Sequence, residues 1–143
     1  EVDLIIEKEG YFLKGQIDLL KTTDNGVEIL DFKAEQKPSP EKLGKELYEQ
    51  KIAQYRKQLQ IYAHLVEQKF RIEVSGMKLY YTNTKEKNPY IIFEKNDFAI
   101  DEMIDEFSSI VDQIQKKNFA SRTKNTSICA DCDMRYYCNR IKR

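Results

Sequence analysis

The sequence lacks the features that mark a membrane or exported protein. No apolar run approaches the ~20 residues that a membrane-spanning helix needs, and no charged segment followed by an apolar one marks a secretory leader. The chain also lacks a charge excess, because 24 basic residues balance 24 acidic ones. We therefore expect a cytoplasmic protein without membrane contact, in which any binding of nucleic acid depends on local clusters of charge.

Histidine and cysteine are both scarce. The single histidine, His64, falls between the apolar positions of its predicted helix, which favours a surface or boundary position over a role as base or metal ligand. The three cysteines, Cys129, Cys132 and Cys138, are too few and too closely spaced for a normal disulfide framework in a cytoplasmic protein. Ligation is the better interpretation, although zinc would need a fourth Cys or His, and three buried structural cysteines are the alternative.

Length and composition predict one modest globular domain. The 143 residues and their 41% apolar content suffice for a single core. We interpret residues 1–143 as one domain, in which residues 120–143 form a cysteine-bearing tail. The first residues already follow a strand pattern and include no initiating Met, so we expect the chain to be a piece of a longer protein.

The apolar periodicities predict a mixture of strands and helices, and so an α/β (α+β) protein. Strands are predicted at residues 2–6, 11–20, 27–32, 77–82 and 90–93. The first three would form a meander, followed by a polar connection that begins near residue 37. Helices are predicted from about residue 47 to residue 66, with a stripe at Ile52, Tyr55, Leu59, Tyr62 and Val66, and over residues 100–114. Asn96 or Asp97 would cap the second helix.

Two acidic residues stand inside the strand patterns on either side of a strong turn. Asp18 closes residues 15–18 (Gly-Gln-Ile-Asp), Asp31 opens residues 31–33 (Asp-Phe-Lys), and a Thr-Asp-Asn-Gly turn separates them. Because both lie at nearly the same distance from the turn, they can face each other across the ladder at roughly 4.5–5.5 Å between Cβ atoms. Carboxylates so close repel each other unless a divalent cation lies between them, which favours Mg²⁺ or Mn²⁺.

Lys33 follows Asp31 by two residues, and side chains two apart point to the same face of a strand. We therefore expect Asp18, Asp31 and Lys33 to converge on one point. The alternative is that an aspartate at a strand end only caps a turn. The strand that carries Asp31 favours a functional role, because an ionised carboxylate in a half-buried strand is costly unless it is paired or metal-bound.

These segments together resemble the PD-(D/E)xK nucleases, specifically the RecB-like branch that includes CRISPR-associated exonucleases and nuclease domains fused to UvrD-like helicases. Residues 15–18 are similar to the Gly-x-x-Asp motif of that branch, and residues 31–33 to its (Asp/Glu)-x-Lys motif. Residues 55–62 (Tyr-Arg-Lys-Gln-Leu-Gln-Ile-Tyr) resemble its Gln-x-x-x-Tyr helix. The cysteine tail is similar to the one that ligates an iron-sulfur cluster in many of these proteins.

The resemblance implies a restriction-endonuclease-like core, in which helices flank a mixed central sheet. It implies that Asp18, Asp31 and the backbone carbonyl of Phe32 hold Mg²⁺ or Mn²⁺, while Lys33 positions the attacking water and lowers its pKa. Gln58 and Tyr62 would support the active site and the DNA strand. For Gln58 the alternative is a residue at the border of the helix face whose polar groups are satisfied by the backbone.

The resemblance also implies a wider context. A 4Fe-4S cluster would bind Cys129, Cys132 and Cys138, with a fourth cysteine and a further metal ligand upstream of Glu1. The activity would be that of a Mg²⁺- or Mn²⁺-dependent deoxyribonuclease, with DNA as substrate and an ATP-dependent helicase motor in the same polypeptide or complex, acting in repair or recombination. The competing hypotheses are a non-catalytic DNA-binding or interaction module that retains the nuclease fold, and a small thiolate-metal module with an unrelated sheet.

Overall fold

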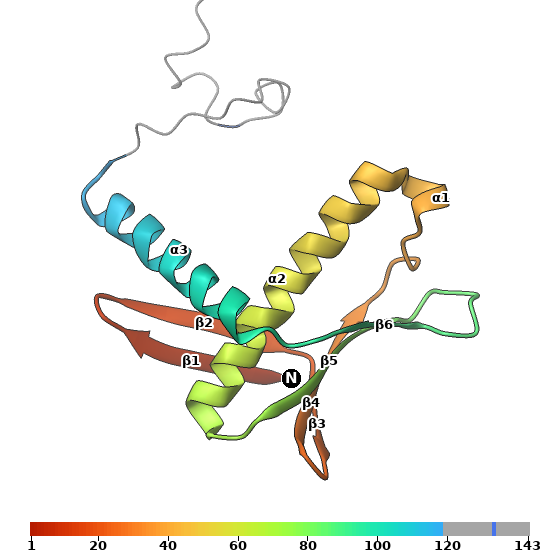
Figure 1. The fold of residues 1–143 in the computed structure, drawn as a ribbon, viewed down its shortest axis with the longest axis horizontal. Coiled ribbons are helices and arrows are strands. Elements are labelled where there is room, and N and C mark those ends of the chain that lie inside the picture. The colour runs from red at the N-terminus through yellow and green to blue at the C-terminus, as the bar shows by residue number, and fades with distance from the viewer. Residues whose placement is uncertain (119–132, 134–143) are drawn as a thin grey trace, which may run out of the picture. The chain divides into compact units, whose positions relative to one another are not determined.

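The computed structural model describes residues 1–118 and residue 133. The chain divides into two units, residues 1–108 and residues 109–143, and the helix Asp97–Gln115 contains the boundary between them. The elements follow one another, as Figure 1 shows, in the order β1 (Val2–Lys8), β2 (Tyr11–Ile17), β3 (Leu19–Thr23), β4 (Gly26–Lys33), α1 (Pro40–Leu43), α2 (Lys45–Phe70), β5 (Val74–Tyr81), β6 (Tyr90–Phe93) and α3 (Asp97–Gln115).

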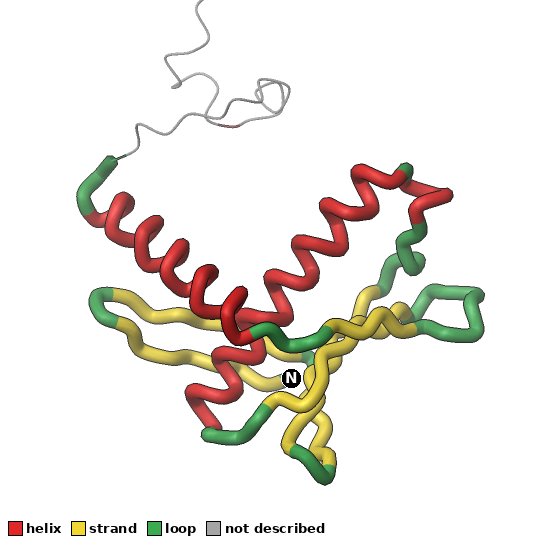
Figure 2. The backbone as a smooth tube through the Cα atoms, in the orientation of Figure 1, coloured by secondary structure: helices red, strands yellow, loops and turns green. Residues whose placement is uncertain are grey.

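The described strands form two sheets (Figure 2). One is the antiparallel hairpin of β1 and β2, and the other has four strands in the order β3-β4-β5-β6. In the larger sheet β4 and β5 are parallel, whereas β3 and β6 run antiparallel to their neighbours. Parallel neighbours need a long crossover connection, and α2 lies in that connection. The predicted α/β class, with a mixed central sheet flanked by helices, is confirmed.

The predicted strand over residues 11–20 is wrong in one respect, because the chain bends at Asp18. The segment before the bend, β2, pairs with β1, and the segment after it, β3, pairs with β4. The first three strands therefore do not form one meander. The apolar alternation ends at the same point, since Ile17 is fully buried and Leu19 is 41% exposed. A strand that changes sheets cannot keep one face buried through the bend.

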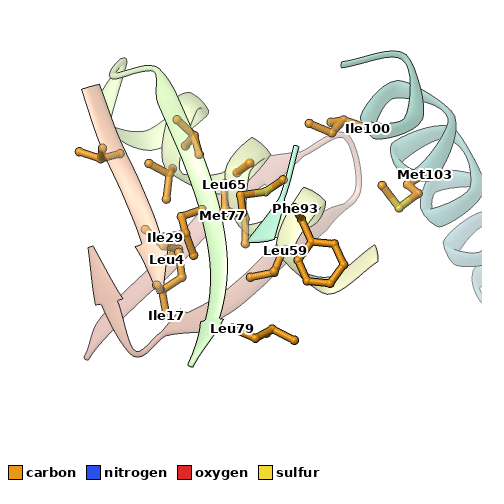
Figure 3. Packing of buried hydrophobic residues seen from close by; sticks show 14 of the residues in the cluster. Leu4, Ile17, Ile29, Leu59, Leu65, Met77, Leu79, Phe93, Ile100 and Met103 are labelled. Carbon is orange, nitrogen blue, oxygen red and sulfur yellow. The ribbon is translucent and has the colours of Figure 1, made fainter. Parts of the chain in front are cut away.

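The hydrophobic core of residues 1–108 lies where α2 packs against the hairpin and the four-stranded sheet (Figure 3). Fully buried side chains from all three parts include Leu4, Ile17, Ile29, Leu59, Leu65, Met77 and Leu79. Burial of a side chain of this size contributes about 1.5–3 kcal/mol to stability. The predicted stripe of α2 is part of this core, with Leu59 and Val66 buried and Ile52, Tyr55 and Tyr62 partly buried.

Gly15 marks the closest approach of the hairpin to α2. A Cβ atom at this position would lie 2.6 Å from Leu65 Cδ1 and 3.2 Å from Tyr62 Cε1. Contacts below 3 Å force a neighbour to move, and the Leu65 side chain is fully buried. Gly15 therefore allows β2 to pack directly against the helix turn that carries Tyr62. This contact also explains why Leu65, outside the predicted stripe, is buried.

The elements that follow α2 agree with the sequence, whereas the short helix that precedes α2 was not predicted. The strands β5 and β6 are present, and Asn96 caps α3 by accepting a hydrogen bond from Ala99 N–H at 3.1 Å. In α3, Ile100 and Met103 are buried in the core, but Phe107 is exposed, so the predicted core stripe is buried only in part within residues 97–108. The unpredicted helix α1 begins at Pro40, where a missing N–H costs nothing.

Within the described residues, no helix is long and apolar enough to cross a membrane. The cysteines of the predicted cluster, Cys129, Cys132 and Cys138, lie outside the described residues, as does most of the predicted tail over residues 120–143. The iron-sulfur prediction and the single-domain interpretation therefore stay predictions.

Candidate active site

The candidate site lies at the carboxyl end of β4, on the face that is covered by α2. Asp31 and Lys33 project from this strand two residues apart, and the Asp31 residue is only 5% exposed. The neighbouring strand β5 runs parallel and ends at the same edge, where Thr82 N–H donates to the Lys33 carbonyl at 3.0 Å. The edge at which parallel strands end is where ligands bind in open α/β sheets.

Asp31 and Lys33 form an ion pair. Lys33 Nζ lies 2.6 Å from Asp31 Oδ2, and the two side chains are 18% and 7% exposed, respectively. Burial raises the pKa of the Asp31 carboxyl, the hydrogen bond and charge of Lys33 oppose that change, and the Asp18 charge adds to it. The ammonium therefore compensates only part of the cost of holding this carboxylate in the interior.

Gln58 joins the ion pair to Tyr62. Its amide Nε2 donates to Asp31 Oδ1 at 3.3 Å and to the Tyr62 hydroxyl at 2.9 Å. Its Oε1 accepts a hydrogen bond from Lys33 Nζ at 3.5 Å. These partners are side chains, not backbone groups, so the geometry places Gln58 within the candidate site. The predicted residues Asp31, Lys33, Gln58 and Tyr62 are thus brought together.

Asp18 reaches the same place from the bend between β2 and β3. Its Oδ2 accepts a hydrogen bond from the Phe32 backbone N–H at 2.7 Å. The ladder between β3 and β4 ends with Leu19 opposite Leu30, one step before Asp18 and Asp31, so the expected Cβ separation of the two aspartates stays a prediction. The bond to the Phe32 N–H fixes the Asp18 carboxylate beside the peptide that joins Asp31 to Phe32. A capping role for Asp18, the alternative from the sequence, has a direct geometric basis.

Three further residues at the site were not predicted from the sequence. The Tyr55 ring centroid lies 4.7 Å from Lys33 Nζ, and the Tyr55 hydroxyl donates to Glu35 Oε1 at 2.5 Å. Lys51 Nζ lies 2.6 Å from the other oxygen of Glu35. The hydrogen bonds of Lys51 and Tyr55 lower the pKa of Glu35, while burial, followed by the Glu35 hydrogen bond, raises the pKa of Tyr55.

A signal for these residues was present in the sequence. Glu35 continues the alternation of Asp31 and Lys33, which places all three on one side of an extended chain. Lys51 and Tyr55 are four residues apart, one turn of α2, and so share a helix face. His64, by contrast, contributes nothing to the site. It is partly buried, burial lowers its pKa, and its Nε2 has no hydrogen-bond partner among the described residues.

The family model of the PD-(D/E)XK nuclease superfamily matches residues 1–139. The chain belongs to this superfamily. No curated protein matches the chain. The mixed sheet with flanking helices is consistent with the restriction-endonuclease-like fold of PD-(D/E)XK proteins. Residues 31–33 (Asp-Phe-Lys) also have the form (D/E)XK that the superfamily name spells out.

Nucleases of the PD-(D/E)XK superfamily typically use divalent metals such as Mg²⁺. The described residues contain no group of three or more His, Cys, Asp or Glu that could hold a metal ion. Asp18 and Asp31 nevertheless supply hard carboxylate oxygens, which Mg²⁺ prefers, and Mg²⁺ keeps several waters and is usually bound through one or two carboxylates. The buried and incompletely compensated Asp31 also fits a cation. The donor set therefore fits Mg²⁺ or Mn²⁺.

Proposed function

We propose that the chain is a metal-dependent deoxyribonuclease domain that hydrolyses phosphodiester bonds. The observation that supports it most is the cluster at the end of β4, where the Asp31-Lys33 pair of a D-X-K segment meets Gln58 of α2 in a chain of the PD-(D/E)XK superfamily. A buried carboxylate with a raised pKa beside a lysine at a sheet edge is the kind of arrangement that functional sites use.

Each residue has a defined role in this proposal. Asp18, Asp31 and the backbone carbonyl of Phe32 hold Mg²⁺ or Mn²⁺, which would stabilise the charge that develops on the phosphate. Gln58 orients the Asp31 carboxylate through the hydrogen bond to Oδ1, and Tyr62 orients Gln58 in turn. Lys33 positions the attacking water and favours its deprotonated form through its positive charge.

The test is cleavage of linear and circular DNA with Mg²⁺ or Mn²⁺. Asp31→Asn and Lys33→Ala are expected to abolish cleavage while DNA binding persists. The first removes a carboxylate ligand of the metal ion, and the second removes the ammonium that positions the attacking water. Two substitutions on the β3-β4 hairpin are matched controls. Asp24→Asn lies in the turn, and Lys21→Ala removes a lysine side chain that is 64% exposed. Unchanged metal-dependent cleavage by either site variant, with a fold retained by circular dichroism, would contradict the assignment.

A second candidate function is a non-catalytic DNA-binding module, and one observation favours it. Both carboxylates already have partners in the chain, since Asp31 contacts Lys33 and Gln58 and Asp18 accepts the Phe32 N–H. Such a module would bind DNA with no cleavage under any divalent metal. Its DNA affinity would also be unaffected by Asp31→Asn. Metal-stimulated cleavage that depends on Asp31 would rule this candidate out.

The wider context rests on the sequence resemblance to the RecB-like branch. We infer a helicase motor as partner, a role in DNA repair or recombination, and a 4Fe-4S cluster at Cys129, Cys132 and Cys138 in the longer protein. Iron and acid-labile sulfide measured in the longer protein, with and without Cys132→Ser, would test the cluster. Bound zinc without iron would contradict it. Co-purification of an ATP-dependent helicase activity with the nuclease would test the partner.

A further inference from the structure

The Lys33 ammonium has three close neighbours at the candidate site. Asp31 Oδ2 lies at 2.6 Å, Gln58 Oε1 at 3.5 Å, and the centroid of the Tyr55 ring at 4.7 Å. A divalent cation bound to Asp31 would repel the ammonium from the same oxygen, because like charges a few ångströms apart interact strongly in a partly buried site. Lys33 therefore needs a second position close to the site when a metal ion is bound.

The Tyr55 ring is held in place at its hydroxyl end. Its hydroxyl is bonded to Glu35, and the second Glu35 oxygen is paired with Lys51. Lys51 and Tyr55 come from one turn of α2, whereas Glu35 follows β4, so the three residues tie the end of β4 to the helix. The aromatic face already lies 4.7 Å from Lys33 Nζ, and the Glu35 charge interacts with Lys33, so together they offer the ammonium an attraction that does not depend on Asp31.

We propose that Tyr55 is the positioning residue of Lys33, whose ring retains the ammonium next to the site when a divalent cation occupies Asp31. Glu35 and Lys51 fix the ring, and Glu35 supplies negative charge at this second position. The inference rests on the proposed metal-dependent function and extends it, since it assigns a role to three residues outside the D-X-K segment. Lys33 thereby stays within reach of the attacking water instead of moving into solvent.

The decisive measurement is Mn²⁺ binding by calorimetry, which needs no cleavage. Without the ring, Lys33 remains on Asp31 and competes with the metal, so Tyr55→Leu is expected to weaken Mn²⁺ binding about three- to tenfold, the worth of a cation-π contact. In a Lys33→Met background the same substitution is expected to change Mn²⁺ affinity less than about twofold. Tyr55→Phe and Tyr55→Trp, which keep an aromatic face, are expected to restore most of the affinity.

Additional variants separate this role from simple packing. The matched control is Tyr48→Leu, seven residues earlier on α2 and also partly buried, which should leave Mn²⁺ binding unchanged. Glu35→Gln, at a 42% exposed side chain, removes the negative charge that attracts the ammonium beside the ring. It should weaken Mn²⁺ binding in the same direction as Tyr55→Leu, again only when Lys33 is present, and it carries the test if Tyr55→Leu fails to fold. With DNA, Tyr55→Leu should lower kcat with little change in KM.

The outcomes separate the inference from the proposed function. Equal weakening of Mn²⁺ binding by Tyr55→Leu with and without Lys33 would show that Tyr55 acts through packing, and would overturn the inference. The proposed function would stand in that case, provided Asp31→Asn abolishes Mn²⁺ binding. A wild-type chain that does not bind Mn²⁺ at all would overturn both.

Discussion

Asp18 Oδ2 accepts the Phe32 N–H at 2.7 Å, one residue beyond the point where the β3-β4 ladder ends. If the ladder continued by one step, its register would place Asp18 opposite Asp31. The Asp18 side chain instead accepts the backbone N–H of Phe32 in β4, while the Asp18 backbone turns from one sheet to the other. The same carboxylate can therefore stabilise the bend and still lie beside the peptide that follows Asp31.

Substitution of Asp18 distinguishes these two roles. Asp18→Asn keeps an oxygen acceptor for the Phe32 N–H but loses the charge, so stability should be retained while metal binding and cleavage are lost. Asp18→Ala loses the acceptor as well and should lower the free energy of unfolding by about 1 kcal/mol. Urea unfolding and Mg²⁺-dependent cleavage measure the two effects. Full cleavage by Asp18→Asn would identify Asp18 as a cap only.

Gln58 links three side chains, so its loss should cost both stability and activity. Gln58→Leu leaves Asp31 Oδ1 and the Tyr62 hydroxyl without their amide partner, which should lower the free energy of unfolding by about 1–3 kcal/mol. The control is Gln54→Leu on the exposed side of α2. Both variants can be compared by urea unfolding and by cleavage rate. Equal stability and equal rates for the two variants would remove Gln58 from the site.

Gly15→Ala should destabilise the chain through a steric contact. The new methyl would lie 2.6 Å from Leu65 Cδ1 in a packed core, and forcing extra volume into a core costs about 1–3 kcal/mol. Because Tyr62 Cε1 is also only 3.2 Å away, the partner of Gln58 should shift as well. The matched control is Gly76→Ala, whose methyl would have its nearest neighbour at 3.4 Å. Thermal unfolding that is the same for both variants would contradict the close packing.

Glu35 should make stability depend on acid pH. The Lys51 hydrogen bond, aided by Tyr55, lowers the Glu35 pKa in the folded chain. Its contribution is therefore present above the ordinary glutamate pKa and is lost as pH falls through the lowered value. Urea unfolding of the wild type and Glu35→Gln from about pH 6 to about pH 3 should show a wild-type advantage that disappears toward the acid end. An advantage that grows as pH falls would contradict the assigned ion pair.

Local patterns were sufficient for the elements and for the chemistry of the D-X-K segment. The alternation around Asp31 and Lys33 follows from the two-residue period of a strand, and the helix periodicity brought Gln58 and Tyr62 onto one side of α2. These regularities depend on neighbours in sequence, so the sequence predicted most strands, the two long helices and four site residues that lie together in the fold. The site roles themselves stay predictions until the variants are tested.

The sequence by itself determined most of the elements, the class and the superfamily of this protein, because these depend on periodicity and on short segments. Only the tertiary structure decided that the chain changes sheets at Asp18, that the Lys33 ammonium lies on Asp31, and that Glu35, Lys51 and Tyr55 form one group beside it. The bonds of Glu35 to Lys51 and Tyr55 join residues 16 and 20 positions apart. The packing of α2 across β4 brings them into contact, and no local period encodes that packing.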